Sequence, residues 1–328
     1  MNVFITGSTG FIGTNLVQKL AESGNTVHAL YRSEEKKKKL IHKNIKPVSG
    51  DILNIESLKN GMNGCQYVYH TAAFTDVWAD KKNDIYDLNV TGTKNVLDTA
   101  LSLGIEKVIF TSTAGVFGPS INTKIEENSI NELKYFLEYE RTKAEAEKLV
   151  KSYSNKNIDI TIVNPTRVYG PGILSKSNSV TKIIKSYING NWRLIPGDGK
   201  SIGNYVFIDD VVNGHILAMK NGKNGERYLL GGSDLSYLDF FLTLKNISGK
   251  QQLMFKVPLF MMLLLSHSMI ISTKIFKTPP PITPELVKKY NYNWRVSSQK
   301  AINDLGYKIT PFEKGAEQTI QWIKNLRL

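Results

Sequence analysis

A tyrosine and a lysine separated by one helical turn, Tyr139 and Lys143, are the residues of this sequence whose types and spacing best suit acid–base chemistry. At a separation of four residues, both side chains lie on the same face of a helix. Free tyrosine has a pKa of about 10, so a neighbouring ammonium group is needed before its proton is useful near neutral pH. Because the chain has 15 tyrosines and abundant lysine, such a pair also arises by chance. It therefore needs support from a second motif.

A glycine-rich segment near the N-terminus gives that support. In the run VFITGSTGFIG, Gly7, Gly10 and Gly13 follow an apolar strand pattern and begin a helical one, with two residues rather than the commoner one between the first two glycines. Glycine suits these positions because the turn needs permissive backbone angles and must approach a pyrophosphate closely. Backbone N–H groups and the helix N-terminus then attract the phosphates. The predicted dinucleotide site consists of Gly7, Ser8, Thr9, Gly10, Phe11, Ile12 and Gly13.

The end of the second predicted strand, Thr26–Tyr31, indicates which dinucleotide binds. An acid at this point hydrogen-bonds the ribose hydroxyls of NAD, whereas an arginine accommodates the 2′-phosphate of NADP. Arg32 follows the strand, and no acid precedes Glu34. A guanidinium can bond a phosphate through two N–H groups and stack on adenine. We therefore predict NADP(H), with NAD(H) as the alternative. Further cofactor contacts are expected from Asp51, Ile52, Thr71, Ala72 and Ala73.

Short apolar runs alternate with longer amphipathic stretches through the first half of the chain. Strands are indicated by β-branched runs bounded by turn residues, at Val3–Thr6, Thr26–Tyr31, Tyr67–Thr71, Lys107–Thr111 and Ile158–Val163. Helices are indicated between them, at Gly10–Ser23, Val90–Leu103 and Tyr139–Tyr153. This alternation predicts an α/β fold with a doubly wound parallel sheet, which binds ligands beyond the carboxyl ends of its strands.

The second half of the chain is less regular and is expected to form a smaller lobe. We predict a dinucleotide-binding Rossmann domain over residues 1–165 and a substrate-binding lobe over most of 166–328. Strands near Tyr205–Ile208 and Arg227–Leu230 are expected to return the segment 203–232 to the sheet or its margin.

Composition narrows the class of protein. The 328 residues are 41% hydrophobic and 22% charged, which is typical of a globular protein. A single cysteine, Cys65, cannot form an intrachain disulfide, and Met1 leads directly into a strand pattern, so we expect a cytoplasmic protein. The formal charge of +13 is not accompanied by a nucleic-acid motif, so no nucleic-acid partner is expected. No cluster has metal-ligand spacing, and hydride transfer to a carbonyl requires no metal.

One strongly apolar stretch, Val257–Ile271, stands apart from the rest of the sequence. It is about fifteen residues long and is interrupted by Ser266, His267 and Ser268, whereas a bilayer span needs about 20 apolar residues. We expect a buried helix or one that covers the site. Contact with a membrane surface or an apolar substrate wall is the alternative, and a true span is the least favoured interpretation.

The glycine-rich turn, the run Phe110–Gly115 and the Tyr139/Lys143 pair together resemble the extended short-chain dehydrogenase/reductase family. Within it, the chain looks most like the dihydroflavonol-reductase-like branch and, more broadly, the NAD-dependent epimerase/dehydratase group. The resemblance covers essentially the whole chain, including Asn164-Pro165-Thr166 and Phe207–Val211.

The resemblance implies a role for each catalytic residue. Tyr139 is the general acid/base, Lys143 lowers its pKa and binds the nicotinamide ribose, and the Thr113 hydroxyl polarises the substrate carbonyl. Family members more often carry serine at this third position, and the adjacent Ser112 leaves the register open. Asn89 matches a further sequence signature of this family, and we interpret its role as structural. Cofactor contacts are also expected from Thr111, Tyr139, Lys143, Pro165, Thr166 and Val168.

Three functions remain open. The first is a reductase that passes hydride from NADPH to a ketone or aldehyde. The second is a nucleotide-sugar epimerase or dehydratase, in which the cofactor is reduced and reoxidised within one cycle. The third is a non-catalytic cofactor-binding regulator, which would not need the intact catalytic group. Nucleotide-sugar members commonly have an Arg-Asp pair where this chain has Gly203-Asn204, which favours the reductase, although Arg193 or Arg167 could substitute.

The substrate is expected to be a small carbonyl compound, apolar or aromatic in character. The residues predicted to contact it are Phe74, Trp78, Thr113 and Tyr169. Relatives often dimerise through the helices that correspond to Val90–Leu103 and Tyr139–Tyr153, so a homodimer is expected from the resemblance.

Overall fold

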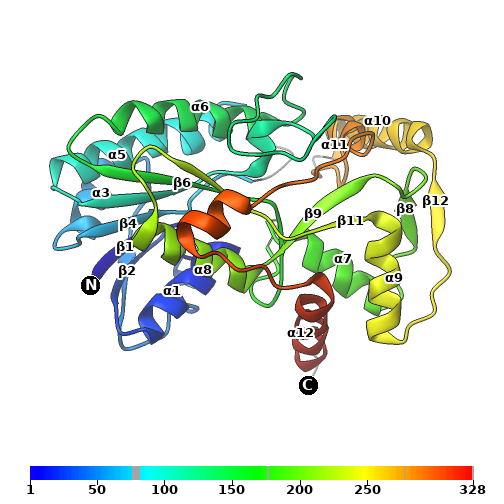
Figure 1. The fold of residues 1–328 in the computed structure, drawn as a ribbon, viewed down its shortest axis with the longest axis horizontal. Coiled ribbons are helices and arrows are strands. Elements are labelled where there is room, and N and C mark those ends of the chain that lie inside the picture. Colours follow the sequence, from blue (N-terminus) through cyan, green and yellow to red (C-terminus); the bar gives the residue numbers. More distant parts are fainter. Residues whose placement is uncertain (76–81, 176, 277, 327–328) are drawn as a thin grey trace.

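A seven-stranded parallel sheet forms the centre of the larger domain (Figure 1). The computed structural model describes residues 1–75, 82–175, 177–276 and 278–326. Along the sheet the strands run in the order β10-β6-β5-β4-β1-β2-β3, and every adjacent pair is parallel. Their bounds are β1 Asn2–Thr6, β2 Thr26–Tyr31, β3 Ile45–Ser49, β4 Tyr67–His70, β5 Lys107–Thr111, β6 Asp159–Pro165 and β10 Arg227–Leu230.

Helices cover both faces of this sheet (Figure 1). One face packs against α1 (Phe11–Glu22) and α8 (Ile208–Asn221), and the other against α3 (Ile55–Met62), α5 (Gly92–Ser102) and α6 (Glu138–Tyr153). The inner strands β1, β4, β5 and β6 are buried on both faces, as expected for a sheet covered on both sides, whereas the edge strand β3 is largely exposed. Two short helices, α2 (Glu34–Lys37) and α4 (Lys82–Tyr86), and a π-helical turn, Asp87–Thr91, complete the domain.

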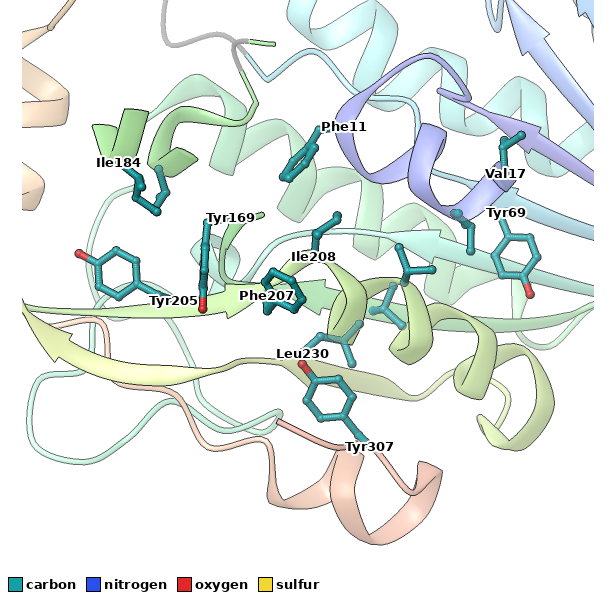
Figure 2. Close-up of a cluster of buried hydrophobic side chains, with 14 of the residues drawn as sticks. Phe11, Val17, Tyr69, Tyr169, Ile184, Tyr205, Phe207, Ile208, Leu230 and Tyr307 are labelled. Carbon is teal, nitrogen blue, oxygen red and sulfur yellow. The ribbon is translucent and has the colours of Figure 1, made fainter. Parts of the chain in front are cut away.

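The smaller lobe contains two further sheets. The first has three strands, β7 (Arg167–Tyr169), β9 (Ile202–Phe207) and β11 (Ser233–Ser236), and the second pairs β8 (Leu194–Pro196) with β12 (Phe255–Val257). Around them lie α7 (Ser179–Ile188), α9 (Tyr237–Ser248), α10 (Leu259–Phe276), α11 (Pro284–Lys289) and α12 (Phe312–Asn325). Figure 2 shows that aromatic rings of this lobe, among them Tyr205 and Phe207, continue the core that extends from α1.

The doubly wound fold predicted from the sequence is confirmed. Two of the predicted strands, Thr26–Tyr31 and Lys107–Thr111, have the observed bounds, and the other three agree within two residues. Of the two strands expected to return to the sheet or its margin, β10 joins the sheet beside β6. The other, β9, pairs with β7 and β11 in the separate three-stranded sheet.

The apolar stretch, expected to be a buried helix or one that covers the site, forms the helix α10, which is not buried. Large side chains on the outer side of α10 are open to solvent, including Phe260, Leu264 and Ile271. Its inner side carries the polar Ser266 and Thr273. Among the described residues, no helix is both long and apolar enough to pass through a bilayer.

Candidate active site

The glycine-rich turn lies between the carboxyl ends of β1 and β4. Gly7 has φ +69°, a conformation that favours glycine, and a Cβ at this position would be 2.6 Å from the backbone nitrogen of Ala72. A Cβ on Gly13 would be 2.1 Å from the Gly7 carbonyl oxygen. Both glycines are therefore required by contacts between backbones, as predicted from their spacing.

The N-terminus of α1 is open to a ligand. Gly10 is its N-cap residue and offers no side chain to the first-turn N–H groups. The Ser8 hydroxyl instead donates to the Leu30 carbonyl oxygen at 2.5 Å, and the Phe11 ring is buried in the core. Backbone donors thus face the end of the helix, which suits a pyrophosphate. The turn fits the dinucleotide predicted from the sequence.

Arg32 and Asp51 lie together at the neighbouring strand ends. An Arg32 Nη atom is 3.4 Å from an Asp51 carboxylate oxygen, and the guanidinium remains 61% exposed. The other Asp51 oxygen accepts from the Leu53 backbone N–H at 2.9 Å. The arginine predicted to bind the 2′-phosphate is therefore accessible, and a carboxylate holds it beside the adenosine end of the predicted site.

Among the other predicted cofactor residues, Thr71 and Thr166 form side-chain hydrogen bonds within the protein, and the rest differ in their exposure to solvent. Thr71 lies beside the turn, and its hydroxyl donates to the Thr6 carbonyl oxygen at 2.8 Å. Thr166 is turned towards β9, where its hydroxyl donates to the Asn204 side chain at 2.8 Å. The partly exposed residues of this group are Thr9, Ile12, Ala72, Ala73 and Val168, whereas Ile52 and Pro165 are buried.

One predicted cofactor residue, Thr111, uses its side chain in a contact within the protein. The Thr111 hydroxyl is buried and donates to His215 Nε2 on α8 at 2.8 Å, since His215 Nδ1 donates to the Val211 carbonyl oxygen. Burial lowers the pKa of His215 to about 4, so the ring is neutral and Nε2 is an acceptor. The side chain of Thr111 thus ties β5 to α8 and is not free to contact a cofactor.

Tyr139 and Thr113 meet at the carboxyl end of β5. The Thr113 hydroxyl lies near the Tyr139 phenol, and the same hydroxyl oxygen accepts from the Gly115 N–H at 3.2 Å. Burial raises the pKa of Tyr139 to about 12, against the opposing effect of Thr113, so the lowering by Lys143 that the resemblance implied is not found in the ligand-free chain. Ser112 is turned into the protein, because side chains alternate along an extended chain. The geometry therefore favours Thr113 over Ser112 as the hydroxyl residue.

Lys143 is fully buried on the same face of α6. Its ammonium lies 4.0 Å from the centre of the Phe110 ring, and no atom of the described residues forms a hydrogen bond with it. Burial lowers its pKa to about 7, and the Glu147 carboxylate one turn away partly opposes this effect. A buried amine without a partner is costly, so its presence points to a ligand that supplies acceptors.

An ion pair that the sequence did not predict lies beside Tyr139. Glu140 is buried next to Tyr139, and its carboxylate forms an ion pair with Lys289, which comes from α11 in the smaller lobe. The indole of Trp294 lies 4.3 Å from this ammonium. A Cβ on Gly115 would be 3.0 Å from Glu140, so the pair lies against the Thr113 loop. Nothing in the local spacing signals a contact between residues 149 positions apart.

Asn89 joins the loop after β4 to α6. Its side-chain oxygen accepts from the Phe74 N–H at 2.8 Å, and its amide donates to the Thr142 hydroxyl at 2.9 Å. These contacts agree with the structural interpretation of Asn89, and they fix the backbone of Phe74 beside the helix that carries Tyr139. Trp78, the next predicted substrate contact, lies outside the described residues.

Tyr169 is not a substrate contact, contrary to the sequence prediction. The residue is fully buried, and its ring packs against Phe207 and Phe312 at centroid distances of 5.7 and 5.1 Å (Figure 2). Its hydroxyl donates to the Phe312 carbonyl oxygen at 3.3 Å. An aromatic residue at the end of a strand can line a pocket or pack in the core, and Tyr169 packs in the core.

A guanidinium surrounded by tyrosines lies at the start of the smaller lobe. Arg167 donates to the Tyr237 hydroxyl at 3.0 Å and lies over the Tyr205 ring. No carboxylate of the described residues forms an ion pair with it. A Cβ on Gly203 would be 2.5 Å from its Nη1 atom, so the guanidinium occupies the space above that glycine.

Comparison with known proteins gives the same family as the sequence motifs. Residues 3–231 match the NAD dependent epimerase/dehydratase family. A Synechocystis sp. protein with the provisional name dihydroflavonol 4-reductase is 30% identical over 98% of this chain and 94% of its own length. Sterol demethylase protein B of Methylococcus capsulatus is 30% identical over 79% of this chain and 78% of its own.

A solved structure with the same fold is UDP-glucuronic acid 4-epimerase from Bacillus cereus in complex with UDP-glucuronic acid and NAD. The TM-score is 0.80 at 24% identity, over 99% of this chain and 100% of the epimerase. At this identity the likeness concerns the fold alone.

Proposed function

Because the chain belongs to the NAD-dependent epimerase/dehydratase family of extended short-chain dehydrogenases/reductases, we propose that it is an NADP(H)-dependent reductase of a ketone or aldehyde. The proposed substrate is a small, apolar or aromatic carbonyl compound. The proposal rests on one observation above all, the Tyr139 phenol held beside the Thr113 hydroxyl at the end of β5.

The Tyr139 phenol, whose pKa is raised to about 12 by burial, can serve as a proton donor. At neutral pH the phenol is protonated and ready to donate, whereas oxidation of an alcohol would require the phenolate as a base. In the proposed reaction, the Thr113 hydroxyl donates a hydrogen bond to the substrate oxygen. Tyr139 then delivers its proton to that oxygen as negative charge develops on it. NADPH, when bound, supplies the hydride.

The residues of this chain that would hold NADPH are arranged along one edge of the sheet. The first-turn N–H groups of α1 and the Gly7 turn receive the pyrophosphate, and Arg32 pairs with the 2′-phosphate. Lys143 donates to the hydroxyls of the nicotinamide ribose, which would give its buried amine the acceptors that the described residues lack.

A substrate panel with a matched variant tests this proposal. Carbonyl compounds and nucleotide sugars are incubated with the protein, and NADPH consumption is followed by the nicotinamide absorbance together with product analysis. Stoichiometric oxidation of NADPH by a carbonyl compound is the expected result. Tyr139→Phe should lower kcat by about 10²–10⁴-fold with an unchanged Kd for NADPH, since only the proton donor is removed. Near-normal turnover in this variant would contradict the mechanism.

A nucleotide-sugar epimerase or dehydratase is the second candidate, and Arg167 is the observation that favours it. Relatives that bind nucleotide sugars commonly carry an arginine at the position of Gly203, and here the Arg167 guanidinium occupies the space above that glycine. The cation that pairs with a diphosphate could therefore be Arg167 on β7 rather than a residue on β9. Conversion of a nucleotide sugar without net oxidation of NADPH would support this candidate, and Arg167→Leu should then abolish binding of the sugar.

A further inference from the structure

Helix α10 carries large apolar side chains on its outer side as well as on the side that faces the protein. The inner side contains the partly buried Met262, Met269 and Ile270, together with Ser266, whose hydroxyl donates to a backbone carbonyl of its own helix. On the outer side, Phe260 and Leu264 are 64% and 67% exposed. A surface helix normally has a polar outer side, with its apolar stripe facing the core.

The exposed apolar side chains of α10 form a stripe that the exposed His267, Ser268 and Ser272 interrupt. The apolar side chains recur at helical spacing along its outer side and continue to the end of the helix: Phe260, Met261, Leu264, Leu265, Ile271 and Phe276. Phe255 on β12 and Leu253 before it are also exposed. Figure 1 shows α10 at the outer edge of the smaller lobe, at the opposite end of the molecule from β1 and β2. A stripe of this kind marks a contact surface, because single exposed apolar residues are normal but contiguous ones are not.

The charge around α10 identifies the kind of surface it fits. The sequence has five lysines and no aspartate or glutamate between Phe240 and Pro284. Lys200, Lys256 and one acid, Asp198, line a cavity of about 680 Å³ together with Leu259, the first residue of α10. Lys288 lies on α11, which packs along α10. An apolar stripe flanked by lysines suits the boundary between acyl chains and anionic headgroups.

A second copy of the chain fits this surface poorly. In a symmetric dimer the same patch faces itself, so the lysines of the two copies would be brought together, with few acids such as Asp198 and Glu285 to pair with them. Each copy also carries a formal charge of +13. An anionic bilayer both covers the apolar stripe and neutralises the lysines.

We propose that α10 docks the protein on the surface of a membrane that contains anionic phospholipids. The helix lies in the plane of the interface with Phe260 and Leu264 among the acyl chains, and it does not cross the bilayer. This docking is independent of the reaction proposed above and would hold for any substrate.

Vesicle binding by the full chain tests the proposal. The protein is sedimented with vesicles of phosphatidylcholine alone and with mixed phosphatidylcholine and phosphatidylglycerol vesicles. We expect binding to the mixed vesicles, and at least tenfold weaker binding for the double variant Phe260→Gln/Leu264→Gln. The matched control is Ile41→Gln/Ile130→Gln, which removes two exposed apolar side chains from outside the stripe and should bind within twofold of the native chain. Circular dichroism checks that both variants are folded.

Several outcomes would overturn the proposal. These are absence of binding to the mixed vesicles, equal binding to both kinds of vesicle, and an equal loss of binding in the control. An unchanged affinity in Phe260→Gln/Leu264→Gln would show that adsorption depends on charge alone. A dimer in sedimentation equilibrium that this variant dissociates would show that the stripe belongs to an interface between two copies.

Discussion

Replacement of Lys143 by methionine should stabilise the ligand-free protein while abolishing its activity. Methionine matches the length of lysine and can pack on the Phe110 ring, but it carries no charge. The Lys143 amine is fully buried without a hydrogen-bond partner among the described residues. The native side chain therefore pays a desolvation cost that the variant avoids.

The magnitude follows from the pKa of Lys143, which falls from 10.5 to about 7 on burial. One pKa unit corresponds to about 1.36 kcal/mol, so the charged amine costs the folded chain up to about 5 kcal/mol relative to the neutral amine. The direction of the pH dependence follows from the difference in proton binding between the folded and the unfolded chain. Between pH 7 and 10.5 the unfolded chain binds one more proton at this lysine than the folded chain does, so the stability of the native protein rises with pH in that interval. The advantage of Lys143→Met should thus be full below pH 7 and shrink as the pH rises.

Urea unfolding followed by circular dichroism, at several pH values from 6.5 to 9.5, measures this difference. The exposed Lys148 on the same helix provides the control, since Lys148→Met should change the free energy of unfolding by less than about 0.5 kcal/mol. Addition of NADPH should narrow the gap between the native chain and Lys143→Met, because the amine then gains acceptors. A variant less stable than the native chain at pH 6.5, or a difference that does not vary with pH, would refute the reasoning.

Three further changes probe the cofactor turn and the ion pair. Arg32→Ala should raise the Kd for NADPH about 10–100-fold by loss of charged hydrogen bonds and leave the Kd for NADH nearly unchanged, as measured by calorimetry; equal changes would contradict the NADP preference. Gly7→Ala should cost more stability in urea unfolding than Gly24→Ala, because both glycines have positive φ (+69° and +82°) but a Cβ meets the backbone only at Gly7. An equal loss of stability in both variants would show that the close backbone approach at Gly7 does not affect stability. Lys289→Met should destabilise the protein by about 3–5 kcal/mol by leaving Glu140 buried without its cation, and Lys289→Met/Glu140→Gln should recover most of that loss; no recovery would show that the lysine acts through other contacts.

Local patterns were enough to predict the sheet and the two motifs at its edge. Strands such as Lys107–Thr111 are continuous apolar runs because both faces of the sheet are covered, and their ends are fixed by turn residues. The glycine spacing also predicted contacts between backbones, since the close approach at Gly13 admits no side chain. These features depend on a few neighbouring residues, so the sequence reveals them directly.

Features that depend on distant residues could not be read in the same way. Whether Tyr169 faces a pocket or the core depends on Phe312, which is 143 positions away. The bond between Thr111 and His215 likewise depends on where α8 crosses the sheet. The exposure of α10 escaped prediction for a different reason. Apolar composition indicates burial in general but does not say whether protein or lipid covers the helix.

Three features of the larger domain are unfavourable in the ligand-free chain, and all three lie near the carboxyl ends of β1, β4 and β5. The first turn of α1 has no side-chain cap, the Gly7 turn keeps a close backbone approach at positive φ, and Lys143 has a buried amine without an acceptor among the described residues. Each could be relieved locally, by a serine cap, a longer turn or a methionine. A single ligand with phosphates at one end and ribose hydroxyls at the other would supply acceptors to both the helix N–H groups and the Lys143 amine, and the Gly7 turn leaves room for it. Since each of these deviations lowers the stability of the ligand-free chain, their coincidence at one edge of the sheet is stronger support for a dinucleotide site than any one of them alone.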